Sequence, residues 1–346
     1  MSARRQWSPW PPRPVPPRRR RHLLRALLIC LLAAVLGLAG LVIGGVWWGT
    51  NHYGDQVARI PHAFPTGPRP TKPPGNTGGS TYLLAGVDRR SDRPTTGSEA
   101  RAALWKYGAQ RSDTLMLVHF SADKGKADIV SIPRDSWVPI PGHGSAKINA
   151  AFSWGGPALM VETVEQLTGS RIDHFGIIDW DGFKTLTDSV GGVPITVHEN
   201  SYDSEQHLGF KTGTRTMNGK EALSYVRQRH GLPGGEFDRI RRQQQFLLSL
   251  VGQARSRVSL TDPLATDHML NAITRTVSVD DHMSNTDLRN LVLGLRHLDT
   301  SRASFGIAPV VRSQMIEGQY ALILDRHGLR TLWRGIETGR PPADGK

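Results

Sequence analysis

The feature that most constrains this chain is an uncharged stretch of 23 residues, 26–48, which directly follows eight arginines. About 20 consecutive apolar residues are enough to cross the hydrocarbon core of a bilayer as a helix. Because the basic flank lies on the N-terminal side, the positive-inside rule places residues 1–25 in the cytoplasm and the rest of the chain outside the cell. The sequence therefore predicts a single-pass transmembrane helix in the cell membrane, followed by an extracellular domain.

A cleaved signal peptide is the alternative interpretation of this stretch. Such peptides have an apolar region of about 7 to 15 residues and a small-residue cleavage site, and residues 46–60 offer no convincing site. The one cysteine, Cys30, lies within the apolar stretch, so the exported part has no disulfide bonds. Its stability must come from burying a core, which its length permits.

The formal net charge of +13 is concentrated at the N-terminus. Residues 1–54 hold eight arginines and no carboxylate, which leaves +5 for the remainder. A nucleic-acid-binding protein concentrates positive charge on its folded part. We therefore expect no nucleic-acid partner.

Strand and helix patterns alternate along the exported part. Residues 49–80, rich in Pro and Gly, are typical of an extended linker, and residues 81–340 of one α/β domain with a mixed central β-sheet and helices on both faces. The patterns predict strands at 81–87, 114–120, 127–132, 172–178, 194–197, 304–310 and 320–324, and helices at 157–167, 182–189, 219–224, 239–254, 263–277, 286–297 and 329–336.

Five arginines fall between residues 225 and 246, within an apolar background that indicates a folded core. Guanidinium groups on rigid elements bind phosphate or carboxylate bidentately. In an extended stretch, Arg227 and Arg229 point to the same side. This segment predicts an anionic ligand.

The helix that follows adds to the same site. If Asp238 caps it, Arg239 lies in the first turn, where the helix dipole stabilises an anion, and Gln243 lies four residues on, on the same face. For Arg241 and Arg242 we favour pairing with carboxylates on a surface helix.

Further polar residues lie at predicted strand ends. Asp88 and Arg90 follow the first strand, Arg111 and Asp113 precede the second, and Arg134 follows the third. Ligands of open α/β sheets bind at such edges. Two carboxylates beside arginines suit a Mg²⁺ ion shared with phosphates, although they could instead cap turns or pair with the arginines. Asp179-Trp180-Asp181 resembles a metal-binding D-x-D motif, but its position favours a helix cap.

These residues resemble the LytR–CpsA–Psr family, whose motifs occur here in order. They are Leu84-Ala85-Gly86-Val87-Asp88, Arg111-Ser112-Asp113-Thr114, Ser131-Ile132-Pro133-Arg134-Asp135, Lys147-Ile148-Asn149, Gly155-Gly156, Asp188 to Val193, Asn218-Gly219, Ala222-Leu223, Arg227-Gln228-Arg229 and Arg239 to Gln243. The match is strong over residues 81–250. The tail, single span and linker also resemble the layout of this family.

The resemblance implies a Mg²⁺-dependent phosphotransferase of the bacterial cell wall. Such enzymes move a glycopolymer from a polyprenyl-pyrophosphate carrier to peptidoglycan, as a phosphodiester to a muramic-acid C6 hydroxyl, and hold the prenyl chain in an apolar tunnel. Carried over, Asp88 and Asp113 are the Mg²⁺-associated acids, and Asp88 and Arg134 act in catalysis. The pyrophosphate contacts are Arg90, Arg111, Arg134, Arg227, Arg229, Arg239 and Gln243.

The chain departs from the family pattern in two places. Glu236 and Asp238 stand where the family often has Asp and Gly, and residues 92–110 lengthen the stretch before Arg111 into an expected mobile loop. Two other functions stay open: a hydrolase of the same lipid-linked pyrophosphate, and a non-enzymatic, membrane-tethered regulator that only binds such anions.

Overall fold

The computed structural model describes residues 49, 51–72, 78–88, 94–98, 100, 103–108, 110–122, 125–257, 263–298 and 302–339. The chain divides into two units, Met1–Gly49 and Thr50–Lys346, and the second of them is compact. None of the helices in the described ranges combines the length and apolarity needed to cross a bilayer. The predicted tail 1–25 and span 26–48 lie outside the described residues.

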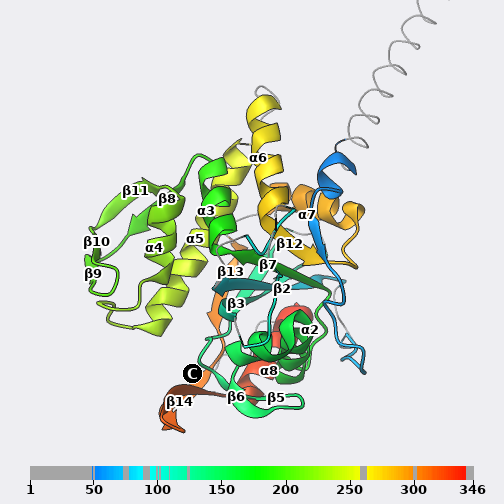
Figure 1. The fold of residues 1–346 in the computed structure, drawn as a ribbon, viewed down its shortest axis with the longest axis vertical. Coiled ribbons are helices and arrows are strands. Elements are labelled where there is room, and N and C mark those ends of the chain that lie inside the picture. The colour runs from blue at the N-terminus through cyan, green and yellow to red at the C-terminus, as the bar shows by residue number, and fades with distance from the viewer. Residues whose placement is uncertain are drawn as a thin grey trace, which may run out of the picture. The chain divides into compact units, whose positions relative to one another are not determined.

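A seven-stranded mixed sheet forms the centre of the second unit (Figure 1). In its middle, β2 (Ser80–Asp88) pairs in parallel with β7 (His174–Asp179) and antiparallel with β3 (Arg111–Phe120). β4 (Ala127–Ser131) forms the predicted hairpin with β3. The outer strands are β12 (Val277–Asp280), β1 (Ala58–Ile60) and β13 (Ser304–Ile307). The prediction of a mixed central sheet is confirmed.

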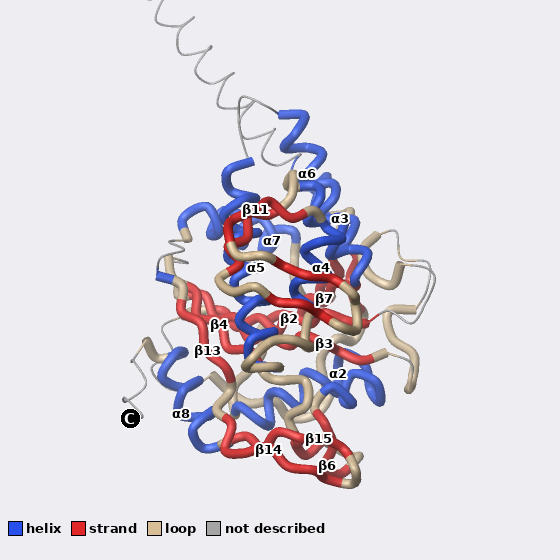
Figure 2. The backbone as a smooth tube through the Cα atoms, turned by 90° about the vertical axis from the view of Figure 1, so that its left-hand side faces the viewer, coloured by secondary structure: helices blue, strands red, loops and turns tan. Residues whose placement is uncertain are grey.

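Helices cover both faces of this sheet, as predicted. On one face lie α2 (Asn149–Thr168) and α8 (Arg326–Glu337), and on the other lie α3 (Trp180–Ser189), α5 (Glu236–Arg257), α6 (Pro263–Thr276) and α7 (Asn285–His297). The two perpendicular views agree on this layering (Figures 1 and 2). Helix α4 (Gly219–Arg227) packs beside α3 and α5.

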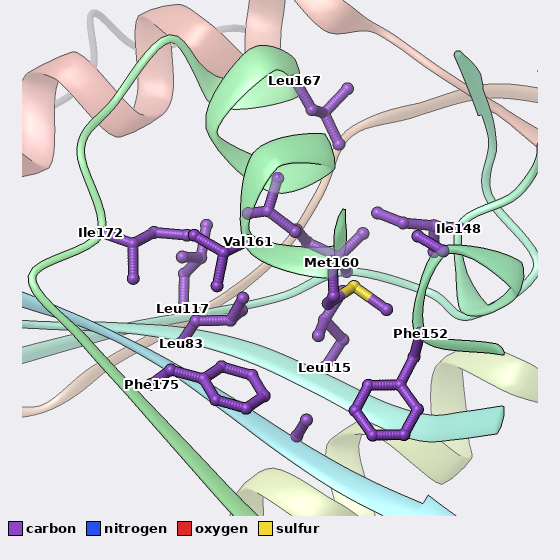
Figure 3. Close-up of a cluster of buried hydrophobic side chains, with 14 of the residues drawn as sticks. Leu83, Leu115, Leu117, Ile148, Phe152, Met160, Val161, Leu167, Ile172 and Phe175 are labelled. Atoms are coloured by element: carbon purple, nitrogen blue, oxygen red, sulfur yellow. The ribbon is translucent and has the colours of Figure 1, made fainter. Parts of the chain in front are cut away.

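The face that carries α2 holds the main apolar core. Leu83 of β2 and Leu117 of β3 lie near Val161 of α2 (Figure 3), and these three side chains and Phe152 of α2 are all buried in one cluster. Alternate residues of a strand face opposite sides of a sheet, so Tyr82 and its period-two neighbours face the α5 and α7 side instead. Truncating one such leucine to alanine typically costs about 2 to 5 kcal/mol of stability.

Four two-stranded sheets decorate this centre. They are β5 (Trp137–Ile140) with β6 (Gly144–Lys147), β8 (Val193–Val197) with β11 (Gly213–Met217), β9 (Ser201–Asp203) with β10 (Leu208–Phe210), and β14 (Val310–Ile316) with β15 (Gln319–Leu324). The sequence patterns identified β8 and β15 but not their partners. These partners, β11 and β14, are largely exposed, so they carry little apolar periodicity.

The prediction that residues 49–80 form an extended linker is wrong for the described residues 51–72. Ile60 and Phe64 are buried in the main core, and β1 pairs in parallel with β12. Arg69 forms a forked hydrogen-bonded ion pair with Glu165 of α2, at 2.7 Å for the shorter contact. This segment is therefore part of the domain.

Among the helices that begin earlier than their patterns predicted, α2 and α5 bear on the cavity and its charged edge. The α2 segment starts at Asn149, and a kink at Gly155 and Gly156 separates its first turns from the predicted 157–167. Gly156 has φ +63°, a left-handed conformation that glycine adopts without strain. Helix α5 starts at Glu236, so Asp238 lies inside its first turn and binds the N–H of Gly234 (2.6 Å).

Candidate functional site

The predicted strand-end residues meet at one edge of the sheet. β2 is antiparallel to β3, and β3 to β4, so β2 and β4 end at the edge where β3 begins. Asp88 lies opposite Arg111 in the β2–β3 register. Arg134, just beyond β4, forms an ion pair with Asp113. Arg90, the other residue predicted here, lies outside the described residues.

A β-bulge sets the position of Asp113. Thr114 pairs with Gly86 and Ser112 pairs with Val87, so Asp113 is an extra residue of β3 with no partner in β2. A bulge bends the strand and re-aims one side chain, and bulges are common beside functional sites. Here it brings Asp113 to Arg134.

The start of α5 forms a second wall. Arg239 donates a hydrogen bond to the backbone carbonyl of Asp113 (3.4 Å) and pairs with Glu236 one turn away. Arg229, which precedes the helix, lies 3.8 Å from Asp135 and 3.7 Å from Glu236. The strand ends and the arginine segment, distant in sequence, therefore build one charged site.

Burial and charge act against each other on these groups. Burial lowers the pKa of Arg134, but Asp113, Asp135 and Glu236 together more than offset this effect, so the pKa lies above its usual value. Burial lowers the pKa of Arg239 despite its partner Glu236. Burial also raises the pKa of Glu236, although three arginines oppose the shift. Burial therefore disfavours the charged forms of Arg239 and Glu236. A bound anion would stabilise the charged arginines.

Several buried polar atoms of the site lack hydrogen-bond partners. Within the described residues, these include Nε of Arg134, Nε of Arg239 and Oε2 of Glu236. An unpartnered buried donor costs about 1 to 3 kcal/mol. Two unpartnered guanidinium N–H groups are what an anion-binding site presents before its ligand arrives.

A cavity of about 820 Å³ opens from this charged edge and runs between the sheet and helices α3, α5, α6 and α7. Eight of the nine predicted site residues line it: Asp88, Arg111, Asp113, Arg134, Arg227, Arg229, Arg239 and Gln243. The rest of its wall is mostly apolar, including Tyr82, Leu84, Met116, Phe246, Leu247, Leu250, Val279, Leu288 and Leu291. The cavity thus joins a cationic end to an apolar interior.

Glycine and period-two spacing keep this cavity open. Tyr82, Leu84 and Gly86 alternate with the core residues of β2 and face the cavity. On β7, a Cβ at Gly176 would come within 3.2 Å of the Leu84 side chain. A larger side chain at residue 176 would therefore take up cavity space.

The carboxylates suit a metal by their chemistry. Asp88 and Asp113 are hard oxygen donors at one edge, beside cations that would hold phosphate, and Mg²⁺ commonly takes one or two carboxylates with phosphate oxygens. A different group, Asp203, Glu205 and His230, has ligand atoms within 4.8 Å of one another. Backbone N–H groups of Glu205 and Gln206 already occupy the Asp203 carboxylate, so this group is a turn rather than a metal site.

The model of the LytR_cpsA_psr family matches residues 61–337 of the sequence. The chain belongs to the LytR_cpsA_psr family. The resemblance inferred from the motifs is confirmed, and the family match also begins within the segment that the sequence patterns had assigned to a linker.

Individual relatives agree with this family assignment. The probable cell wall biosynthesis protein LcpB of Corynebacterium glutamicum is 39% identical over 223 residues, which cover 64% of this chain and 53% of LcpB. The chain spans about half the length of the curated relatives it matches. B. subtilis TagV shares the fold, with a TM-score of 0.60, 25% identity, and coverage of 77% of this chain and 99% of TagV. The structure of TagT bound to LIIa-WTA has a TM-score of 0.61 and 23% identity, covering 80% and 98%.

Within this LytR_cpsA_psr domain, Glu236 and Asp238 have separate positions. Glu236 is buried against Arg239 and Arg229, whereas Asp238 pairs with the exposed Arg241. The predicted surface pairing is thus confirmed for Arg241. It is wrong for Arg242, which is buried and donates to Gln228 (2.6 Å).

The residues that lengthen the stretch before Arg111 are anchored where the structure describes them. Thr95 donates its backbone N–H and its hydroxyl to the buried Asp179, at 2.8 and 3.0 Å. The Trp105 ring N–H bonds the carbonyl of Ser153 (3.1 Å), and a Cβ at Gly156 would meet that ring. These contacts anchor Thr95 and Trp105, and the mobility of the loop stays a prediction.

Sequence patterns missed several residues of the site. Asp135 pairs with Lys147 (3.0 Å), and both line the cavity with Asn149, Trp180 and Tyr320. Asp135, Lys147 and Asn149 stand in the recognised motifs, but nothing in their spacing indicated proximity. The β5–β6 hairpin that returns Lys147 to Asp135 gave no periodic signal.

Proposed function

We propose that this protein transfers a glycopolymer from a polyprenyl-pyrophosphate carrier to peptidoglycan. The observation that carries the proposal is the cavity itself, in which predicted arginines and acids border an apolar interior. A charged head joined to a long hydrocarbon chain is the ligand class that matches both halves. Membership of a family whose relatives include a probable cell wall biosynthesis protein supports the same conclusion.

The reaction follows from the charges at the sheet edge. The acceptor, a muramic-acid C6 hydroxyl, forms a bond to the phosphorus that carries the glycan. The bond from that phosphorus to the bridging oxygen breaks, and polyprenyl monophosphate leaves. Phosphoryl transfer depends mainly on positioning and on neutralising oxygen charge, which is the role we assign to Arg134, Arg229 and Arg239.

Asp88 orients the acceptor hydroxyl or takes its proton, because it stands at the strand end beside Arg111. Mg²⁺ held by Asp88 and Asp113 would supply further neutralisation of the phosphate oxygens. The arginines bind the departing phosphate, whose charge grows as the bridging bond breaks. Gln243 donates a hydrogen bond to the carbonyl of Val226 (3.3 Å). This bond ties α5 to α4 where the charged end of the cavity meets the apolar interior.

We place the domain outside the cell, on a single N-terminal anchor. Residues 1–25 would lie in the cytoplasm and 26–48 would cross the membrane, as the charge pattern indicates. In this arrangement the domain meets lipid-linked donor in the membrane and peptidoglycan outside it.

Reconstitution of the full-length protein in detergent micelles tests the proposal. The protein is incubated with lipid-linked glycopolymer, peptidoglycan fragments and Mg²⁺, and products are read by mass spectrometry. A covalent polymer–peptidoglycan adduct is expected, and it should be lost on chelation with EDTA. Released polymer phosphate without adduct would overturn transfer in favour of hydrolysis, and donor binding without turnover would favour a regulator. Arg241→Ala is the matched control, because Arg241 is exposed, lies outside the cavity lining and, among the residues that the structure describes, forms its ion pair with Asp238.

A further inference from the structure

One arginine of the cavity is held differently from the others. Arg227 ends α4, and its guanidinium lies over the ring of Trp180 at 3.5 Å from the ring centroid. Trp180 begins α3, the helix that packs beside α4, and both residues line the cavity. Within the described residues, Arg227 forms no ion pair.

The kind of partner matters for anion binding. Arg134 and Arg239 are each paired with a carboxylate, which takes up N–H donors and cancels charge. A ring face contacts the flat side of a guanidinium and uses none of its in-plane N–H groups. Arg227 therefore keeps its full fork of donors and its net charge for a ligand while its plane is held in place.

Trp180 is itself anchored from behind. Asp179 caps α3, accepting from Gly182 N–H at 2.8 Å, and the same carboxylate accepts the two hydrogen bonds from Thr95. The backbone N–H of Asp179 donates to the Thr96 hydroxyl (3.1 Å). The segment 94–98, part of the added stretch before Arg111, thus fixes the residue that precedes Trp180.

We propose that Trp180 is a positioning residue for the transfer reaction: it holds Arg227 by stacking on its flat side, which leaves the in-plane donors of that guanidinium available to the pyrophosphate of the donor. The inference rests on the proposed function. The proposed function is extended here by a role for Trp180, an aromatic side chain that the sequence patterns treated only as part of a helix cap.

The test uses inorganic pyrophosphate as the probe, which has no prenyl chain. Full-length protein in detergent micelles with Mg²⁺ is titrated calorimetrically. Trp180→Leu should weaken binding about three- to thirty-fold, the range expected for a lost cation–π contact, and Trp180→Phe should restore most of it. With lipid-linked donor, Trp180→Leu should raise KM much more than it lowers kcat.

A double-mutant cycle separates positioning from simple lining of the cavity. If Trp180 acts through Arg227, adding Trp180→Leu to Arg227→Ala should cause no further loss of pyrophosphate affinity. An equal loss in both backgrounds, or unchanged affinity in the single variant, would overturn the inference while leaving transfer by the wild type intact. Should Trp180→Leu fail to fold by circular dichroism, Trp180→Met serves in the same cycle. Absence of transfer by the wild type would instead contradict the proposed function.

Discussion

Asp88 lies directly opposite Arg111 across the antiparallel pair β2 and β3, at the edge where the cavity opens. Two residues along β3, the bulge leaves Asp113 outside the ladder, and Arg134 from the next strand end binds it. Two carboxylates are thereby held apart at the same edge, each beside a different arginine. This arrangement allows Asp88 to orient or deprotonate the acceptor hydroxyl while Asp113 pairs with Arg134.

Replacing Asp88 with asparagine should separate chemistry from binding. The amide keeps the size of the side chain but cannot accept a proton, and positioned general bases typically contribute about 10²- to 10⁴-fold to rate. We expect turnover of lipid-linked donor to fall by that order, with pyrophosphate affinity, measured calorimetrically without Mg²⁺, within a few-fold of wild type. Equal turnover in both proteins would remove Asp88 from the mechanism.

Arg134→Ala should weaken binding of the anion and also disturb Asp113. The substitution leaves a half-buried carboxylate without its ion-pair partner and removes a donor from the site. Pyrophosphate affinity should drop at least ten-fold, and Arg134→Lys should recover part of it because a lysine restores charge but not the fork. Arg241→Ala, measured alongside, should bind as the wild type does. Similar losses in Arg134→Ala and Arg241→Ala would point to a general charge effect.

Gly176→Leu should obstruct the apolar interior and spare the charged edge. The new side chain would start 3.2 Å from Leu84 and extend into the cavity. We expect weaker binding of a fluorescent polyprenyl phosphate with little change for inorganic pyrophosphate, and an intermediate effect for Gly176→Ala. Parallel losses for both ligands would mean that the substitution disrupts the sheet itself.

Arg69→Ala tests whether the segment 51–72 belongs to the domain. Glu165 is almost fully buried, so removing Arg69 leaves its carboxylate charge without an ion-pair partner. Breaking a buried ion pair costs about 3 to 5 kcal/mol of the free energy of unfolding. Lys184→Ala removes a half-exposed pair with Asp181 and should cost under about 1 kcal/mol. Urea denaturation of the full-length protein measures both. A negligible effect of Arg69→Ala would restore the view of this segment as a linker.

The stability of the domain should depend on pH through His119. Burial lowers the pKa of His119 in the folded state, although the negative charge of Asp128 opposes this shift. In the unfolded chain the pKa is about 6.5. Below that value the unfolded chain binds more protons, so this contribution is complete above about pH 6.5 and is lost as the pH falls towards the folded pKa. The midpoint of urea denaturation should fall between pH 7.5 and 5 by less in His119→Gln than in the wild type. An identical fall in both proteins would assign the dependence to other groups.

Much of the fold could be predicted from local patterns. The β3–β4 hairpin, the mixed sheet and the helices of both faces follow from apolar periodicity and turn residues, because burial of one face repeats every two or 3.6 residues. The patterns failed where burial is not periodic. β1 is three residues long in a Pro-rich context, and its membership in the sheet depends on β12, more than 200 residues away.

The sequence alone determined the family, the separation of an apolar N-terminal stretch from an α/β domain, and the types of residue that face an anion. Tertiary structure decided which of them meet. The bulge that frees Asp113, the stack of Arg227 on Trp180 and the burial of Glu236 behind Arg239 all join segments that are distant along the chain or turned by local geometry. A motif records the chemical type of a side chain, whereas its direction depends on the packing of elements that the motif does not contain.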